Sequence, residues 1–390
     1  MTSRVFVGLS LIPQCSPPAP KLRRAGALAT GQAGGVERKK VFVGLSGGVD
    51  SAVSAALLKQ QGHSVVGCFI KIWQPEFIEC TWREDRLDAM RVAAALGIPF
   101  REVDFSDEYK REVVDSMVAD YARGITPNPD VLCNRAIKFG HFFKWAWAEG
   151  ADSIATGHYA RALYERLRKS FILKRGKDSN KDQSYFLWQL GEQELSRTLF
   201  PIGDLKKREV RVLARKLGLP NAGKPDSQGL CFVGDVSMDE FLARFISVTP
   251  GDVLDMAGRT IGTHKGAALY TVGQRHGFTT KTSSGEGAHY VVSVDIPTNA
   301  ITVSPDRSDA AQKEVSMREV NWIGDEPSFP LEAMVQARYR ETPVSANLHY
   351  DGKTMRVIFT DPHIVSPGQS LVVYLGERCL GGGVIQIVNS

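Results

Sequence analysis

Apolar residues between positions 40 and 160 follow two patterns that alternate along the chain. Short, continuous apolar runs have the length of buried parallel strands, whereas the stretches between them repeat apolar residues at helical spacing. The predicted strands are 41–45, 64–70, 98–105 and the start of 152–159, and the predicted helices are 51–62, 85–97, about 106–123 and about 131–148. Strict alternation of strand and helix predicts a doubly wound parallel sheet, with ligands beyond the carboxyl ends of its strands.

The pattern changes after about residue 235. Short segments there alternate apolar and polar residues with period two, between turns rich in Gly and Pro. Asp351 followed by Gly352 is a hairpin signal within this region. We therefore predict an α/β chain with a parallel-sheet domain over 40–235, a small and mostly β domain over 236–305, and a β-barrel over 306–390.

Residues 1–39 lie outside this pattern. Before Glu37 they combine Pro, Ala, Gly and Ser with four basic residues and no acidic residue, a composition that cannot build a core. The hexapeptide VFVGLS occurs at 5–10 and again at 41–46, but only the second copy continues into GGVDS. Two interpretations stay open: an organelle transit peptide, or a leader without function that carries a partial duplication. The repeat favours the second.

Composition and charge narrow the class of protein. The 390 residues are 43% hydrophobic and 23% charged, which suits a globular protein of two or three domains. No apolar run reaches the roughly 18 residues of a membrane span. The net charge of +5 permits a polyanionic partner without requiring one. The six cysteines contain no CxxC pair, which argues against zinc ribbons and most iron–sulfur sites, and their scatter indicates a reducing compartment.

The segment GLSGGVDS (44–51) joins the first predicted strand to the first predicted helix. A Gly-rich turn at this place directs backbone N–H groups at phosphate, and Ser46 and Ser51 add hydroxyl donors. Asp50 would either cap the helix or help to hold Mg²⁺. Neither a Walker A lysine nor GxGxxG is present, so the loop suits attack on the α-phosphate with release of pyrophosphate. The alternative is a tight turn without chemistry.

Two cysteines, 98 residues apart, lie where chemistry is expected. Cys133 falls in the first turn of the last predicted helix, where the helix dipole and nearby Arg135 and Lys138 favour the thiolate. Asp130 is either the N-cap of this helix or an acid–base group, and the sequence alone favours the cap. Cys231 lies in a Gly-bearing segment, DSQGLCFVG, that has no core periodicity.

The other cysteines carry no predicted chemistry. We interpret Cys68 and Cys379 as buried apolar residues, Cys15 lies in the leader, and Cys80 has no role that the sequence supports. An adenylating loop together with two reactive cysteines indicates sulfur transfer. In such a reaction a persulfide supplies sulfur to an activated carbon, and a second thiol releases it by forming a disulfide.

Seven motifs occur in the order found in the tRNA-uridine 2-sulfurtransferases, and the chain resembles that family from about Lys40 to its C-terminus. They are GLSGGVDS, TPNPDVLCNRAIKFG, ATGHYAR, KDQSYFL, DSQGLCFVG, YTVGQRHG and CLGGG. The first is similar to the pyrophosphatase loop of the ATP-pyrophosphatase superfamily. The resemblance implies an adenine-nucleotide α-hydrolase-like catalytic domain, a central domain that binds tRNA, and the closing barrel.

The resemblance also implies roles for individual residues. Expected ATP contacts are Gly44, Leu45, Ser46, Gly47, Gly48, Val49, Asp50, Ser51, Ile70 and Gly157. Expected tRNA contacts are Asn128, Pro129 and Asp130 at the target base, and Lys181, Asp182, Gln183, Arg338 and Tyr339 elsewhere. Cys231 matches the persulfide carrier, Cys133 its partner thiol and Asp130 an acid–base residue, while His158 and Gln369 match positions linked to activity.

Several of these residues have a plainer alternative. Taken alone, His158 would be a loop histidine whose ring nitrogens are hydrogen-bonded locally, and Lys181 or Arg338 would be a charged residue in contact with water. Two features depart from the family: Ile70 stands where relatives commonly carry Met, and the leader is extra.

The implied reaction is ATP-dependent 2-thiolation of the wobble uridine at position 34 of tRNA. ATP, with Mg²⁺, is the implied co-substrate, and no resident metal site is expected. Implied partners are the tRNAs for Lys, Glu and Gln and a persulfide donor, either a cysteine desulfurase or a sulfur-relay protein, and no membrane. The expected compartment is the cytoplasm, or the mitochondrial matrix if residues 1–39 are a transit peptide.

Two other kinds of protein would share part of this pattern. The first is a related synthetase. One that made 2-thiocytidine would be expected to carry CxxC pairs, which this sequence lacks, and one of the amidotransferase type would need neither Cys133 nor Cys231. A non-catalytic tRNA-binding protein would not need an intact GGVDS loop.

Overall fold

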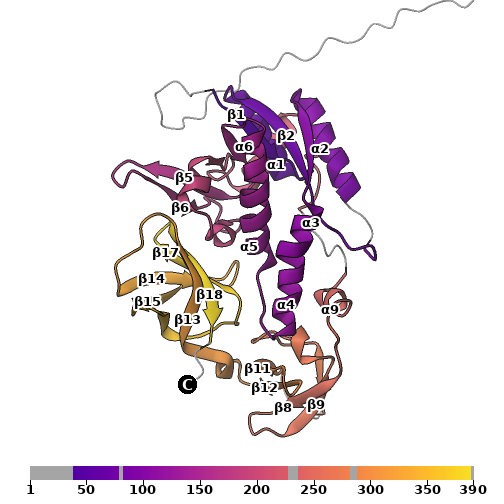
Figure 1. The fold of residues 1–390 in the computed structure, drawn as a ribbon, viewed down its shortest axis with the longest axis vertical. Helices are drawn as coiled ribbons and strands as arrows, with labels where there is room; N and C mark the ends of the chain where they lie inside the picture. Colours follow the sequence, from indigo (N-terminus) through magenta and orange to yellow (C-terminus); the bar gives the residue numbers. More distant parts are fainter. Residues whose placement is uncertain (1–37, 79–81, 227–235, 282–287, 388–390) are drawn as a thin grey trace, which may run out of the picture. The chain divides into compact units, whose positions relative to one another are not determined.

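The computed structural model describes residues 38–390, apart from 79–81, 227–235, 282–287 and 388–390. Residues 1–37 of the leader, including Cys15, therefore lie outside the described residues, as do Cys80 and the predicted persulfide carrier Cys231. The described chain forms three β-sheets with helices (Figure 1). Within it, no helix is long and apolar enough to cross a membrane.

The first sheet is parallel throughout, in the order β3-β2-β1-β4-β7. Its strands are β1 (Lys40–Gly44), β2 (Ser64–Lys71), β3 (Phe100–Asp104), β4 (Ser153–Ala155) and β7 (Thr198–Leu199). Chain order runs outward in opposite directions from β1, so the topological switch point lies between β1 and β4. Ligands of such sheets bind at the carboxyl ends of these strands, and the predicted doubly wound sheet is confirmed.

Both faces of this sheet are buried, as the continuous apolar runs predict. Val41 and Val43 of β1 pack into the core that includes α1 (Val49–Gln60), α2 (Trp82–Leu96) and α8 (Lys207–Lys216). Phe42, which points the opposite way, packs against the helices that follow β3. Alternation of side chains along a strand explains why one strand supplies both cores.

Each of the two long predicted helices is interrupted by a π-helical stretch. The first consists of α3 (Ser106–Tyr109), η1 (Lys110–Asp115) and α4 (Ser116–Ala122), and the second of α5 (Pro129–Cys133), η2 (Asn134–His141) and α6 (Phe142–Ala148). The two π-helical stretches, η1 and η2, contact each other: the ring of His141 in η2 lies 3.1 Å from the carboxylate of Glu112 in η1. Such stretches are frequent near functional sites, and η2 begins directly after Cys133.

The hairpin of β5 (Ala160–Glu165) and β6 (Ser170–Arg175) did not follow from the sequence pattern. It leaves the first domain and pairs with the barrel, where Arg378 of β18 lies opposite Lys174 of β6. The remaining short elements of the first domain are η3 (Ser184–Leu187) and α7 (Glu192–Ser196), and α9 (Met238–Leu242) follows it.

The second and third sheets follow in sequence. The second has the order β10-β9-β8-β12-β11, with β8 (Gly251–Leu254), β9 (Thr260–His264), β10 (Phe278–Thr280), β11 (Tyr290–Asp295), β12 (Ala300–Ser304) and the 3₁₀ turns η4 (Ala267–Leu269) and η5 (Arg307–Ala310). The third contains β13 (Ala311–Trp322), β14 (Leu331–Gln336), β15 (Val344–Tyr350), β16 (Met355–Ile364), β17 (Ser370–Leu375) and β18 (Arg378–Gln386). Pairing of β13 with both β16 and β18 closes these six strands into a barrel.

Two local predictions in this part are confirmed. The Asp351-Gly352 turn joins β15 to β16, with Tyr350 opposite Met355 and Gly352 at a φ of +87°. Cys379 of β18 is fully buried, and burial raises the pKa of its thiol to about 12. Cys68 of β2 is likewise buried with a raised pKa, so both behave as apolar residues.

Candidate functional site

The loop from Leu45 to Gly48 leaves β1 at the switch point and enters α1. Gly47 has a φ of +74°, and a Cβ there would lie 2.5 Å from the backbone oxygen of Asp85 in α2. Only glycine satisfies both conditions. The backbone at this turn therefore packs directly against the backbone of α2, just before the N-terminus of α1.

Side chains of the loop brace one another. The backbone N–H of Ser46 donates to Ser51 Oγ over 3.2 Å, and that hydroxyl lies 3.2 Å from the Gly48 carbonyl oxygen. The two serine hydroxyls are 3.3 Å apart. The predicted donors thus face one another across the turn, and their contact with phosphate remains a prediction.

Two predicted ATP-site residues outside the loop also lie beside it. A Cβ on Gly157, which follows β4, would be 2.7 Å from the Ser51 nitrogen, so this glycine allows the loop after β4 to touch the first turn of α1. Ile70, near the end of β2, reaches toward Gly44, since a Cβ placed on Gly44 would be 3.8 Å from Ile70 Cδ1. The predicted ATP residues are therefore neighbours in space, although contact with ATP remains a prediction.

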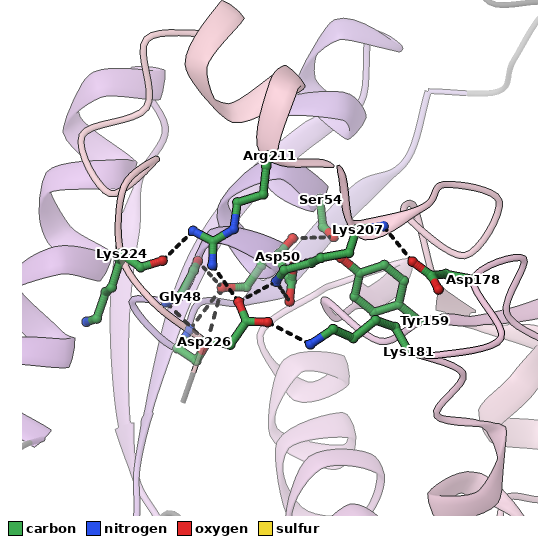
Figure 2. A network of polar contacts seen from close by, with 12 residues as sticks. Gly48, Asp50, Ser54, Tyr159, Asp178, Lys181, Lys207, Arg211, Lys224 and Asp226 are labelled. Atoms are coloured by element: carbon green, nitrogen blue, oxygen red, sulfur yellow. Dashed lines mark hydrogen bonds and ion pairs between the residues drawn. The ribbon is translucent and has the colours of Figure 1, made fainter. Parts of the chain in front are cut away.

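Asp50 does not cap α1, and that interpretation was wrong. The N-cap residue is Gly48, so no side chain caps this helix, and Asp50 lies within the first helical turn. Its carboxylate instead accepts a hydrogen bond from the Tyr159 hydroxyl over 2.8 Å and pairs with the Lys207 ammonium, 2.8 Å from each carboxylate oxygen. Figure 2 shows this arrangement.

A second carboxylate, Asp226, extends this network (Figure 2). It pairs with Lys207 at 2.7 Å, with Lys181 at 2.7 Å and with Arg211 at 2.6 Å. Partial burial alone would raise the pKa of Asp226, but hydrogen bonds from Lys181 and Lys207 hold this pKa far below its usual value. Asp226 is the last described residue before the segment that contains Cys231.

Sequence reasoning missed most of this network. Lys207 and Arg211 lie in α8, a strongly charged helix in which lysine and arginine resemble solvated residues. Asn221, which donates from Nδ2 to the Gly47 carbonyl oxygen over 2.8 Å, carries no motif. The one local signal was Asp226, the first residue of the DSQGLCFVG motif.

The segment around Cys133 starts earlier than predicted. The helix begins at Pro129, and its N-cap is Asn128, whose Oδ1 accepts from the Val131 N–H over 3.3 Å. The prediction that Asp130 is the N-cap was therefore wrong. Cys133 is the last residue of α5, beyond the first turn rather than within it, so the dipole argument for its thiolate weakens.

Asp130 has the properties of an acid–base group. Asp130 is exposed as a whole residue, yet the atoms packed around its carboxyl remove water from it. This desolvation raises the pKa of Asp130, although the positive charge of Lys138 lowers it in part. A raised pKa makes a carboxyl a stronger proton acceptor than a free aspartate, which is compatible with an acid–base role. Its role as the acid–base residue remains a prediction.

His158 lies between this helix and the ATP loop. It is buried, its Nδ1 is 2.8 Å from the Thr156 hydroxyl, and its ring packs on Phe139 of η2 and on Phe200. Burial, aided by the charge of Lys138, lowers its pKa well below 6.5. The imidazole is therefore neutral, and it joins the strand end that carries Gly157 to the helix that carries Cys133.

We predict a pH dependence of stability from this histidine. Below about pH 6.5 the unfolded imidazole takes up a proton that the folded one does not. The free energy of unfolding therefore decreases as the pH is lowered below this value, by about 1.4 kcal/mol per pH unit. Denaturant midpoints between about pH 5 and 7 should show this slope reduced in His158→Gln. The exposed His349→Gln is the control. Equal slopes for His158→Gln and the wild type would contradict the prediction.

The predicted tRNA contacts at 181–183 use their side chains inside the protein. Asp182 is buried and accepts from the Gly176 and Ser184 N–H groups and from Arg175. Gln183 accepts from the Tyr159 N–H over 3.0 Å. Lys181 pairs with Asp226. Their contact with tRNA is not tested, but the structure gives each of them a local role.

Gln369 of the barrel holds the loop before α5, and Arg338 contacts the second domain. Gln369 donates from Nε2 to the carbonyl oxygens of Thr126 and Pro127, each over 2.9 Å. This fixes the chain directly before Asn128. Arg338 donates to the Val272 carbonyl oxygen over 3.0 Å, which ties the barrel to the second domain.

Tyr339 places an aromatic ring between the barrel and the first domain. Its ring centroid is 4.4 Å from that of Phe186 in η3. Tyr339 therefore lies where the barrel meets the first domain, whereas Arg338 lies where it meets the second. The contact of both residues with tRNA stays a prediction.

Three family models match the chain in succession. A tRNA methyl transferase HUP domain matches residues 39–235, a tRNA methyl transferase PRC-barrel domain matches 239–305, and an aminomethyltransferase beta-barrel domain matches 312–385. Together these matches span most of the described chain.

Relatives in other organisms match over nearly their whole length. The tRNA-specific 2-thiouridylase MnmA of Nitrosomonas eutropha is 44% identical over 361 residues, which cover 90% of this chain and 99% of that protein. The protein of the same name from Akkermansia muciniphila is 43% identical over 356 residues, with the same coverage. That of Stenotrophomonas maltophilia is 45% identical over 360 residues, covering 90% of this chain and 94% of the relative.

Proposed function

We propose that this chain, which belongs to the tRNA-specific 2-thiouridylase family, catalyses the ATP-dependent 2-thiolation of the wobble uridine at position 34 of tRNA. The observation that carries the proposal is the braced serine–glycine loop at the switch point, at the N-terminus of a twelve-residue helix. Such a helix start binds phosphate. Methyl transfer, which the names of two family models mention, would not use a site of this kind.

The first step activates the base. The C2 oxygen of uridine forms a bond to the α-phosphorus of ATP, the bond from that phosphorus to the bridging oxygen breaks, and pyrophosphate leaves with the electron pair. The N3 proton of the base must be removed, and Asp130 is our candidate acceptor because of its raised pKa. The base must leave its stack to reach the site.

The second step brings sulfur. The outer sulfur of a Cys231 persulfide attacks C2, AMP leaves, and the Cys133 thiolate attacks the inner sulfur. The sulfur–sulfur bond of the persulfide breaks, sulfur stays on C2, and a Cys133–Cys231 disulfide forms that a dithiol reductant must reopen. Release of hydrosulfide before attack on C2 gives the same products. We propose a cysteine desulfurase or a sulfur-relay protein as the donor.

Magnesium would accompany ATP rather than reside in the protein. Among residues 38–390 with the gaps given above, no group of three or more His, Cys, Asp or Glu is placed to hold a metal ion. Asp50 offers one carboxylate beside the phosphate loop, which suits Mg²⁺ bound mainly through nucleotide and water oxygens. When bound, the ion would neutralise phosphate charge.

Partners and compartment extend the proposal. The expected tRNAs are those for Lys, Glu and Gln, and the expected compartment is the cytoplasm. The predicted domain bounds, with a central domain over 236–305 that grips tRNA through its phosphates, are part of the same proposal.

The test is a reconstituted reaction. The full chain is incubated with ATP, a persulfide donor and unmodified tRNA, and the tRNA is then digested and analysed for 2-thiouridine by mass spectrometry. Formation of 2-thiouridine only when ATP is present is the expected result. If the wild-type protein thiolates none of the tested tRNAs, the proposed function is wrong.

A further inference from the structure

We propose that Lys207 binds the pyrophosphate part of ATP and stabilises it as it leaves, an inference that rests on the proposed function. The phosphate loop itself, residues 44–51, contains no lysine or arginine. Lys207 is the first residue of α8, 157 positions after Asp50 in the sequence. The fold thus supplies from a distant helix the cation that the loop lacks.

The ammonium of Lys207 lies beside the start of α1. It is 2.8 Å from both carboxylate oxygens of Asp50 and 2.7 Å from Asp226 Oδ1 (Figure 2). Since Asp50 is the second residue of the twelve-residue helix α1, the lysine charge and the N-terminal amides act on the same space. Only 15% of the Lys207 side chain is exposed, so water screens its charge weakly.

The carboxylates do not need Lys207 to be satisfied. Asp50 keeps the hydrogen bond from the Tyr159 hydroxyl, at 2.8 Å. Asp226 keeps its pairs with Lys181 and Arg211, at 2.7 and 2.6 Å. A purely structural role would therefore be redundant, whereas an ammonium held at the mouth of a phosphate loop is explained by an incoming anion.

Asn221 gives a second sign that the loop receives a ligand. This side chain is only 6% exposed, and its Nδ2 donates to the Gly47 carbonyl oxygen over 2.8 Å. Its Oδ1 is buried without a hydrogen-bond partner in the described part of the chain. A buried amide oxygen left open against the loop backbone suits a donor from a ligand, such as a nucleotide hydroxyl.

The role in the reaction follows from the charge that develops. As the bond between the α-phosphorus and the bridging oxygen breaks, that oxygen takes the electron pair and gains negative charge. The Lys207 ammonium donates a hydrogen bond to the departing pyrophosphate and keeps its proton. Charge of this kind, placed before the reaction starts, stabilises the transition state more than the bound substrate.

The experiment compares two cations of α8 that share Asp226. Lys207→Met removes the charge next to Asp50, while Arg211→Met removes one that contacts Asp226 and backbone oxygens but not Asp50. Calorimetry with inorganic pyrophosphate should show roughly tenfold weaker binding for Lys207→Met and little change for Arg211→Met. Single-turnover release of pyrophosphate from saturating ATP, with tRNA, should slow about 100-fold or more in Lys207→Met alone.

Further variants separate a structural role from the proposed one. Lys207→Arg should recover part of the rate, because it restores charge, while Lys207→Gln should not. Equal thermal midpoints show that the variants fold, and Lys207→Gln replaces Lys207→Met if the latter does not. If Lys207→Met and Arg211→Met behave alike in pyrophosphate binding and release, while the wild type thiolates tRNA, this inference is wrong and the proposed function stands. A wild type that forms no 2-thiouridine rejects the function instead.

Discussion

Asp50→Ala is expected to abolish pyrophosphate release and 2-thiouridine formation together. The carboxylate lies in the first turn of α1, where it holds the Lys207 ammonium and the Tyr159 hydroxyl beside the phosphate loop. Without it, the Tyr159 hydroxyl loses this partner, Lys207 keeps only its pair with Asp226, and no carboxylate is left in the first turn of α1 for a nucleotide-bound cation. Loss of one such group commonly slows the chemical step by roughly 10²–10³-fold.

The measurement is single-turnover pyrophosphate release with saturating ATP and tRNA, followed by nucleoside mass spectrometry. Asp107→Ala is the matched control, since Asp107 is an exposed aspartate in the first turn of α3. Asp50→Asn should be as inactive as Asp50→Ala, because the amide keeps the size of the side chain but loses the charge. Activity of Asp50→Ala within a few-fold of the control would contradict the role given to this residue.

Cys133→Ser is expected to separate the two half-reactions. Serine has nearly the same shape, but its hydroxyl cannot attack a persulfide to form a disulfide. Adenylation does not use the thiol, so pyrophosphate should still be released in one turnover. Formation of 2-thiouridine should drop by about 100-fold or more, because sulfur transfer has lost the group that completes it.

Cys379→Ala is the control for cysteine loss without loss of chemistry. This thiol is fully buried in the barrel, and its removal should lower stability slightly while thiolation continues. Undiminished thiolation in Cys133→Ser would reject the two-cysteine mechanism and leave the thiolation activity itself in place. Loss of pyrophosphate release in the same variant would show that Cys133 acts before sulfur transfer.

Local patterns predicted the framework well. Apolar runs and helical spacing located β1 to β4, α1, α2 and both long helices, because burial of a strand or helix face depends on residues close in sequence. The Gly-rich turn could be located for the same reason, since its geometry needs glycine at Gly47, and its binding of phosphate stays a prediction. The barrel hairpin at Asp351-Gly352 is another local feature.

The errors concern choices between neighbouring polar residues. Asn128, not Asp130, caps α5, and Gly48, not Asp50, precedes α1. Any short polar residue near a helix start can cap it, so the sequence leaves the choice open. The tertiary contacts of Asp50 and the packing around Asp130 draw these carboxylates into other roles.

The sequence by itself thus determined the alternating sheet, the Gly-rich turn after its first strand and the membership in a family of tRNA-modifying enzymes. It could not show that Lys207 and Asp226 lie at that loop, or that Asp182 and Gln183 serve the fold. Periodicity and turn chemistry act over a few residues, whereas an ion pair forms between whichever charges the folded chain brings together. Lys207 and Asp50 meet across 157 residues of sequence, and only the tertiary structure makes them neighbours.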